Sequence, residues 1–175
     1  MKAGWVWWAN TNKNGLPFEE KVDFLNKVSK IPHYEIKNWY EVFYRGEKVA
    51  ESYKKHNLYK LFLLPKGIDY KKIISAKLLP DDAIFVIIKN TLFIVEIKFQ
   101  ECSWSTDEKL QTCHFKKGQY QRLTKSLWIN IEYCYVLNDW YKQSKYDDVL
   151  NYIQAMDCKY FFNDLPLDYL GLPIE

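Results

Sequence analysis

The clearest pattern of apolar and polar positions lies between residues 78 and 100. A short polar turn separates an apolar run that ends at Ile88 from a second run over residues 92–99. Both runs are rich in β-branched and aromatic residues and have the length of buried strands, so they predict a β-hairpin. Glu96 and Lys98 interrupt the second run, and their spacing places both side chains on one face of that strand.

The rest of the chain alternates between helical and strand-like patterns. Proline at position 17 suits the first turn of a helix, and Ser105 with Glu108 fits a capping box at the start of another. Residues 34–44 are aromatic and match neither pattern clearly. The order of elements predicts an α/β fold with a central mixed β-sheet of about four to five strands flanked by helices. The expected helices cover residues 17–31, 46–64, 105–123 and a segment from 146, and the other expected strands cover 73–79, 130–137 and 159–162.

The two charged residues in the second strand of the hairpin are chemically unusual. Desolvation costs several kcal/mol for each buried charge unless a partner or a bound ion compensates. Asp81 and Asp82 stand at the start of the partner strand and bring a further carboxylate to the same place, although strand alternation allows only one of them to face it. Two carboxylates and an ammonium group suit a hard divalent cation and an oriented water. An exposed cross-strand ion pair on an open sheet face is the alternative.

Pro80-Asp81, followed after fourteen residues by Glu96-Ile97-Lys98, resembles the Pro-Asp…(Asp/Glu)-x-Lys motif of the PD-(D/E)XK nuclease superfamily. Only this copy of the triplet lies inside an apolar strand and follows a Pro-Asp that opens a neighbouring strand. The resemblance implies a restriction-endonuclease-like core over about residues 45–165, with residues 1–44 as an N-terminal extension of one domain spanning 1–175. Other acidic residues two positions before a lysine are Glu19, Glu35, Asp69, Asp107 and Asp157.

The resemblance also implies roles for individual residues. Asp81, which directly follows the proline as in the family, and Glu96 would bind Mg²⁺ together with the backbone carbonyl of Ile97, and Mn²⁺ would be able to substitute. Lys98 would hold the attacking water and stabilise the charge of the phosphate. Related families take a further catalytic glutamate from the helix before the Pro-Asp strand, which is Glu51 here, with Glu47 behind it. A solvated helix face is the other interpretation of Glu51.

The charge distribution supports a polyanionic partner more than the net charge of +3 does. Residues 45–77 carry nine Lys and Arg against three acidic residues, whereas residues 126–175 carry three against eight. A basic segment on each side of the hairpin and an acidic tail indicate a polarised surface on which a nucleic acid could dock. Ordinary solvated faces are the alternative. The expected nucleic-acid contacts are Lys54, Lys55, His56, Lys109, Gln111 and Lys117.

Composition narrows the class of protein. No apolar run approaches the roughly 20 residues of a membrane span, so we expect no membrane association and a cytoplasmic location. The four cysteines form no Cys-x-x-Cys pair, which favours free, buried thiols over a zinc site or disulfides. The tryptophans at positions 5, 7 and 8 fit either an edge strand packed on the core or surfaces that stack on bases.

Three functions are compatible with this sequence. The first is a Mg²⁺-dependent endonuclease acting on double-stranded DNA, most similar to a type II restriction endonuclease and a homodimer if its site is palindromic. The second is a nuclease of the same fold that acts on RNA or on branched or damaged DNA. The third is a nucleic-acid-binding module that does not cut, against which the intact Asp81, Glu96 and Lys98 speak.

Overall fold

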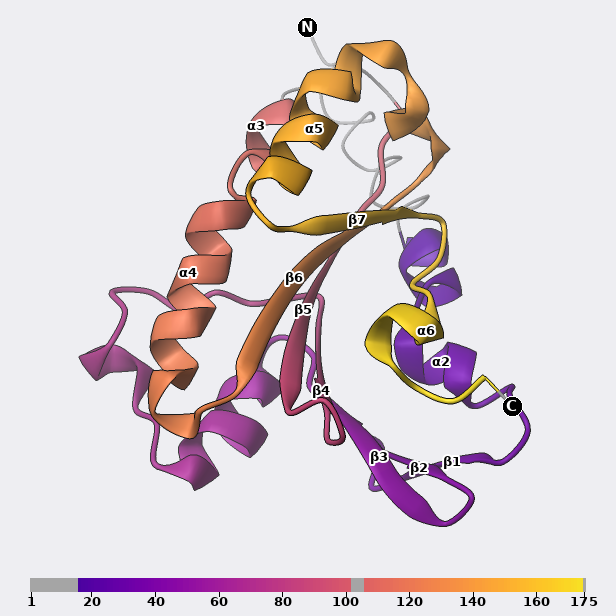
Figure 1. The fold of residues 1–175 in the computed structure, drawn as a ribbon, viewed down its shortest axis with the longest axis vertical. Coiled ribbons are helices and arrows are strands. Elements are labelled where there is room, and N and C mark those ends of the chain that lie inside the picture. The colour runs from indigo at the N-terminus through magenta and orange to yellow at the C-terminus, as the bar shows by residue number, and fades with distance from the viewer. Residues whose placement is uncertain (1–15, 102–105, 175) are drawn as a thin grey trace, which may run out of the picture.

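The computed structural model describes residues 16–101 and 106–174, and within them seven strands form one mixed β-sheet (Figure 1). The strands lie in sequence order from β1 to β7. Neighbours from β1 to β5 are antiparallel, while β5, β6 and β7 are parallel. The strands are β1 (Tyr34–Lys37), β2 (Glu41–Tyr44), β3 (Glu47–Ser52), β4 (Asp82–Val86), β5 (Thr91–Lys98), β6 (Asn130–Leu137) and β7 (Lys159–Phe162).

Helices cover both faces of this sheet. One face carries α3, α4 and α5, which connect the parallel strands, together with the short helical turns after β3; the other face carries α2, α6 and a helical turn over residues 16–21 (Figure 1). The α-helices are α2 (Phe24–Val28), α3 (Thr106–Leu110), α4 (Cys113–Thr124), α5 (Asp147–Ala155) and α6 (Leu167–Leu170). The π- and 3-10 turns are Leu58–Leu63, Leu64–Lys66, Tyr70–Lys72, Lys125–Leu127, Asp139–Lys142 and Ser144–Tyr146.

The strand β5 lies at the centre of the molecule and is buried on both sides. Leu92 and Ile94 pack into the core beneath α4, and Phe93 and Val95 pack into the core beneath α2 and α6. This alternation follows from the period of two in an extended chain. It continues along the strand, so Glu96 and Lys98 lie on the α4 face.

Several sequence predictions are confirmed. The α/β class, the mixed sheet flanked by helices, the hairpin of β4 and β5, the strands β6 and β7 and the helix α5 are all present. Cys113, Cys134 and Cys158 are free and buried as expected. Among the described residues, no helix has the length and apolar character needed to cross a bilayer. Cys102, the tryptophans at positions 5, 7 and 8 and the Ser105 cap lie outside the described residues.

Other predictions are wrong. The sheet has more strands than expected, because residues 34–52 form β1, β2 and β3 rather than an ambiguous segment followed by a helix. Residues 73–79 form no strand. The helix expected over 105–123 is divided into α3 and α4 by a break at Gln111 and Thr112. The sheet therefore extends into the segment predicted as an N-terminal extension.

Candidate active site

The register of β4 and β5 decides which of the two aspartates faces Glu96. Asp82 pairs with Val95, so the preceding Asp81 stands beside Glu96 on the α4 face. Asp82 points to the opposite face, where its carboxylate accepts hydrogen bonds from the Ser52 hydroxyl at 2.8 and 3.0 Å and from the Ala83 N–H at 2.8 Å. Burial raises the pKa of Asp82 to about 6. The structure thus brings Asp81, not Asp82, to the candidate site.

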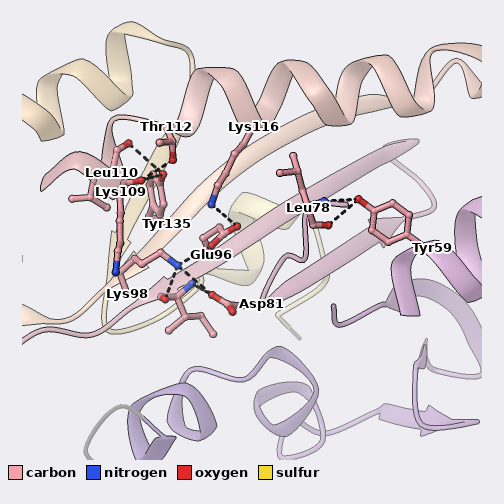
Figure 2. A network of polar contacts seen from close by, with 11 residues as sticks. Tyr59, Leu78, Asp81, Glu96, Lys98, Lys109, Leu110, Thr112, Lys116 and Tyr135 are labelled. Carbon is pink, nitrogen blue, oxygen red and sulfur yellow. Dashed lines mark hydrogen bonds and ion pairs between the residues drawn. The ribbon is translucent and has the colours of Figure 1, made fainter. Parts of the chain in front are cut away.

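Three oxygen atoms converge on the ammonium group of Lys98 (Figure 2). Its Nζ donates to Glu96 Oε2 at 2.8 Å and to the carbonyl oxygen of Ile97 at 3.1 Å, and lies 3.5 Å from Asp81 Oδ2. The Ile97 N–H donates to the same Asp81 oxygen at 2.8 Å and fixes its position. Two carboxylates and one backbone carbonyl, from both strands of the hairpin, therefore surround a single positive charge.

Burial makes the charges of this cluster depend on one another. Glu96 is only 6% exposed, so it is not half of an open surface pair, and that alternative is wrong. Burial alone raises the pKa of Glu96, but the ammonium groups of Lys98 and Lys116 outweigh it and hold the pKa below its usual value. Burial lowers the pKa of Lys98, but Glu96 and Asp81 outweigh it and raise that pKa. Both groups are consequently ionised at neutral pH.

A second lysine reaches Glu96 from the helix α4. Lys116 Nζ donates to Glu96 Oε1 at 3.1 Å, so each carboxylate oxygen of Glu96 has its own ammonium partner (Figure 2). Sequence reasoning missed this residue and named the neighbouring Lys117 as a nucleic-acid contact. Lys117 is 5% exposed, and its Nζ donates to the carboxylate of Asp157 at 2.7 Å. Its position gives no support to a nucleic-acid contact, because it faces the core.

Two buried tyrosines hold the segments that frame the cluster. The hydroxyl of Tyr135 on β6 lies 3.2 Å from the carbonyl oxygens of both Lys109 and Leu110 and anchors the end of α3 to the sheet (Figure 2). The hydroxyl of Tyr59 donates to the Leu78 carbonyl at 2.8 Å and accepts from the Leu78 N–H at 2.9 Å. This second pair of bonds fixes the irregular segment that leads into Pro80 and Asp81.

The oxygen set around Lys98 fits a small divalent cation. Mg²⁺ prefers oxygen ligands and commonly takes one or two protein carboxylates, with waters and phosphate oxygens filling its octahedron. Asp81, Glu96 and the Ile97 carbonyl offer such a set, and their negative charge already attracts a cation, that of Lys98. Among residues 16–101 and 106–174, no three His, Cys, Asp or Glu side chains gather as a metal-binding group, so two carboxylates are the full acidic contribution here.

The structure does not bring Glu51 to this cluster. Glu51 lies on β3 rather than on a helix, opposite Phe85, which pairs with Leu92. Leu92 precedes Glu96 by four residues, or about 13 Å along the strand. The carboxylate of Glu51 pairs with Lys48 at 2.5 Å and accepts a hydrogen bond from the Tyr53 hydroxyl at 2.7 Å. The glutamate expected from a preceding helix is therefore not found at this position. Glu47 lies on the same strand and is exposed.

The remaining predicted nucleic-acid contacts lie on the surface. Lys54, Lys55 and His56 follow β3 and are exposed, as are Lys109 and Gln111 at the break between α3 and α4. Lys55 is tied to the motif, because its N–H donates to the carbonyl of Pro80 at 3.0 Å. Lys54 forms an ion pair with Asp23. The side chains after β3 thus stand next to the Pro-Asp pair.

A cleft of about 380 Å³ opens on the α2 face of the sheet, where Ile84 and Val95 line it, and reaches the cluster at Asp81. Asp81 and Ile97 line it together with Lys54 and Lys55, and the opposite wall comes from the N-terminal helical segment, including Glu19, Glu20 and Asp23. This wall could not be predicted from the sequence, since its residues lie about 60 positions before Asp81 and only the fold places them there.

Comparisons of the chain with protein-family models, curated proteins and solved structures found no match.

Proposed function

We propose that this protein is a Mg²⁺-dependent nuclease of the PD-(D/E)XK type that hydrolyses phosphodiester bonds in double-stranded DNA, as a type II restriction endonuclease does. The observation that carries the proposal is the convergence of Asp81, Glu96 and the Ile97 carbonyl on one cationic position beside Lys98. The motif supplies the same residues in the same roles. A homodimer would match a palindromic site.

The architecture around the motif also supports this proposal. The Pro-Asp strand and the Glu-x-Lys strand are antiparallel neighbours, and a helix then leads to a parallel strand. This sequence of elements is the one expected of a restriction-endonuclease-like core, to which β1 and β2 add an extension of the sheet. Exposed basic side chains stand on both sides of the cluster, where a phosphate backbone would lie.

In the proposed reaction a water attacks the phosphorus in line with the leaving oxygen, giving by family analogy a 5′-phosphate and a 3′-hydroxyl. A bound divalent cation would supply Lewis acidity and lower the pKa of a coordinated water. Asp81 and Glu96 would hold that cation. Asp81 and Glu96 raise the pKa of Lys98 and hold its ammonium group beside them, where it would donate hydrogen bonds to the water and the phosphate oxygens. Lys116 would keep the second oxygen of Glu96 in place.

A cleavage assay tests the proposal. Purified protein is incubated with plasmid DNA, phage DNA, branched DNA and RNA, each with Mg²⁺ or with EDTA. Discrete DNA bands that require Mg²⁺ and disappear in Lys98→Ala support the restriction-type activity. Lys89→Ala, in the turn between β4 and β5, is the matched control and retains activity. If the wild type cleaves only RNA or only branched DNA, that nucleic acid is the substrate instead of double-stranded DNA. If the wild type cleaves none of the four substrates, the proposal is overturned.

A further inference from the structure

An exposed tryptophan stands at the turn between β1 and β2. Trp39 is 61% exposed, although an indole is among the largest apolar side chains. Its φ of 59° and the φ of 49° at Asn38 lie in the left-handed region, which costs a bulky residue free energy. Neither burial nor local backbone preference explains why a tryptophan occupies this turn.

Aromatic contacts hold this turn firmly against the core. The ring of Trp39 meets Tyr40 edge-on with centroids 5.1 Å apart, and Tyr40 packs on Tyr53 at 5.4 Å. Tyr53 in turn contacts Phe62, which contacts Phe85 on β4. The indole is thus supported from behind by a row of rings that ends in the core beneath α4, while its own surface remains open to a ligand.

The turn lies at the same end of the sheet as the candidate active site. The Ser52 N–H donates to the Tyr40 carbonyl at 2.8 Å, and the Ser52 hydroxyl donates to Asp82, the residue after Asp81. Ser52 pairs with Ile84, and Ile84 pairs with Phe93, three residues before Glu96, so three strand spacings and three residues separate the turn from Glu96, or about 17 Å between backbones. Tyr40 and Tyr53 pack on the core beneath α4, which is the face of Asp81 and Glu96.

Positive charge lies beside this turn. Lys54, Lys55 and His56 are exposed in the segment after Ser52, and Lys54 and Lys55 share a cleft with Asp81. In the part of the chain that the structure describes, Lys55 and His56 form no ion pair, so both are free to contact phosphates. This charge stands at the end of β3, the strand between β2 and β4, and so lies between the turn and the Pro-Asp pair.

We propose that Trp39 stacks on a nucleobase of the bound nucleic acid, at a base that has left its helical stack. This inference rests on the proposed nucleic-acid substrate and adds a binding subsite to it. The faces of a paired base are covered by its neighbours, so an indole can stack only on an opened, kinked or unpaired base. At about 3.4 Å per nucleotide, a separation of about 17 Å places this base roughly four to six nucleotides from the cleaved bond.

The left-handed backbone provides a sharp test. Glycine suits a positive φ, so Trp39→Gly relieves strain while it removes the ring. Trp128 is the matched control, since it is 88% exposed with a φ of 55° and lies at the opposite end of the sheet, where the Asn90 side chain binds its carbonyl. We expect both glycine variants to be folded and at least as stable as the wild type. Binding is measured in EDTA with fluorescein-labelled duplex, branched and single-stranded DNA and RNA.

Trp39→Gly is expected to weaken binding by roughly 5- to 150-fold, and Trp39→Tyr to restore most of it, while Trp128→Gly binds as the wild type does. In a second measurement, 2-aminopurine replaces one base at a time along the DNA strand. Its fluorescence should be quenched at one position when the wild type or Trp128→Gly binds, but at no position when Trp39→Gly binds.

Binding that is equal in all variants, or the absence of a quenched position, overturns the inference and leaves the nuclease proposal intact. Quenching at one position without any Mg²⁺-dependent cleavage supports the Trp39 subsite and overturns the nuclease proposal. A wild type that binds none of these nucleic acids overturns both.

Discussion

Lys98 occupies the point at which the acidic oxygens of the site converge, and this gives the residue two opposing effects. Its ammonium group stabilises Asp81 and Glu96 while no other cation is bound. The same contacts mean that a metal ion has to compete with it for three oxygen atoms. The residue that the motif assigns to catalysis is therefore also the residue that protects the metal-free site from charge repulsion.

Replacing Lys98 by methionine is expected to separate these effects. Lys98→Met should be less stable than the wild type in EDTA, because the Asp81 and Glu96 carboxylates lose a shared partner. Mg²⁺ should then bind more tightly, and at ten times its Kd should stabilise the variant by about 1.4 kcal/mol, or about 3–6 °C in Tm for a chain of this size. Thermal unfolding with and without Mg²⁺ measures the shift. Adding Asp81→Asn to Lys98→Met should abolish the stabilisation by Mg²⁺. A Mg²⁺-induced rise in the Tm of Lys98→Met that is no larger than that of the wild type would contradict the proposed ligand set.

Side chains that reach the site from a distant part of the chain could not be predicted from the motif. Glu96 and Lys98 are two positions apart on a strand, so their common face follows from the sequence alone. Lys116 reaches Glu96 from a helix 20 residues later, and its orientation depends on the break between α3 and α4. A continuous helix through residues 105–123 would have a different rotation at this point. The sequence alone therefore does not identify Lys116 as the partner of Glu96.

At the scale of elements, the clearest failure concerns residues 46–64. Val49, Tyr53 and Leu61 have a spacing close to that of a helix, but Glu47–Ser52 also alternates in burial and is paired on both sides, with β2 and with β4. Pairing with two neighbours decides the outcome over local propensity. The hairpin of β4 and β5 was predictable because its apolar runs are long enough for burial on both faces, and β6 was predictable from its alternating residues.

Tyr59 is expected to control the irregular segment that leads to Asp81. Tyr59→Phe leaves the N–H and carbonyl of Leu78 without a partner and should lower the free energy of unfolding by about 1–3 kcal/mol. Burial raises the pKa of Tyr59 to about 12 from the ordinary value of 10.0. The folded-state pKa is the higher one, so the hydroxyl's contribution is complete below pH 10 and is lost as the pH rises through 12.

Urea unfolding of the wild type and Tyr59→Phe across this alkaline range checks the sign. The advantage of the wild type should be constant below pH 10 and should then shrink by about 1.4 kcal/mol per pH unit. Stability curves that remain parallel up to pH 12 would show that Tyr59 does not carry this linkage.

The whole molecule has an uneven distribution of charge that its net charge conceals. The segment with nine basic residues leads directly into the Pro-Asp strand, and the acidic segment begins before β6 and ends with the chain. Electrostatic attraction of a polyanion is therefore expected at the end of the sheet that carries Asp81 and Lys98, and not uniformly over the surface. The sequence predicted this polarity, but only the structure shows that Lys54 and Lys55 share a cleft with Asp81.

The salt dependence of nucleic-acid binding tests this polarity. Each phosphate contact contributes close to one unit to the slope of log Kobs against log salt, because binding releases a condensed counterion. Replacing Lys54, Lys55 and Lys109 together by glutamine should reduce the slope by about two to three, because Lys54 already pairs with Asp23, and should weaken binding to all sequences alike. The control replaces Lys142, Lys145 and Lys159, which lie in the acidic segment, and removes the same net charge. Equal loss of slope in both triple variants would mean that only total charge matters, and that the basic side chains beside the cluster do not position the nucleic acid.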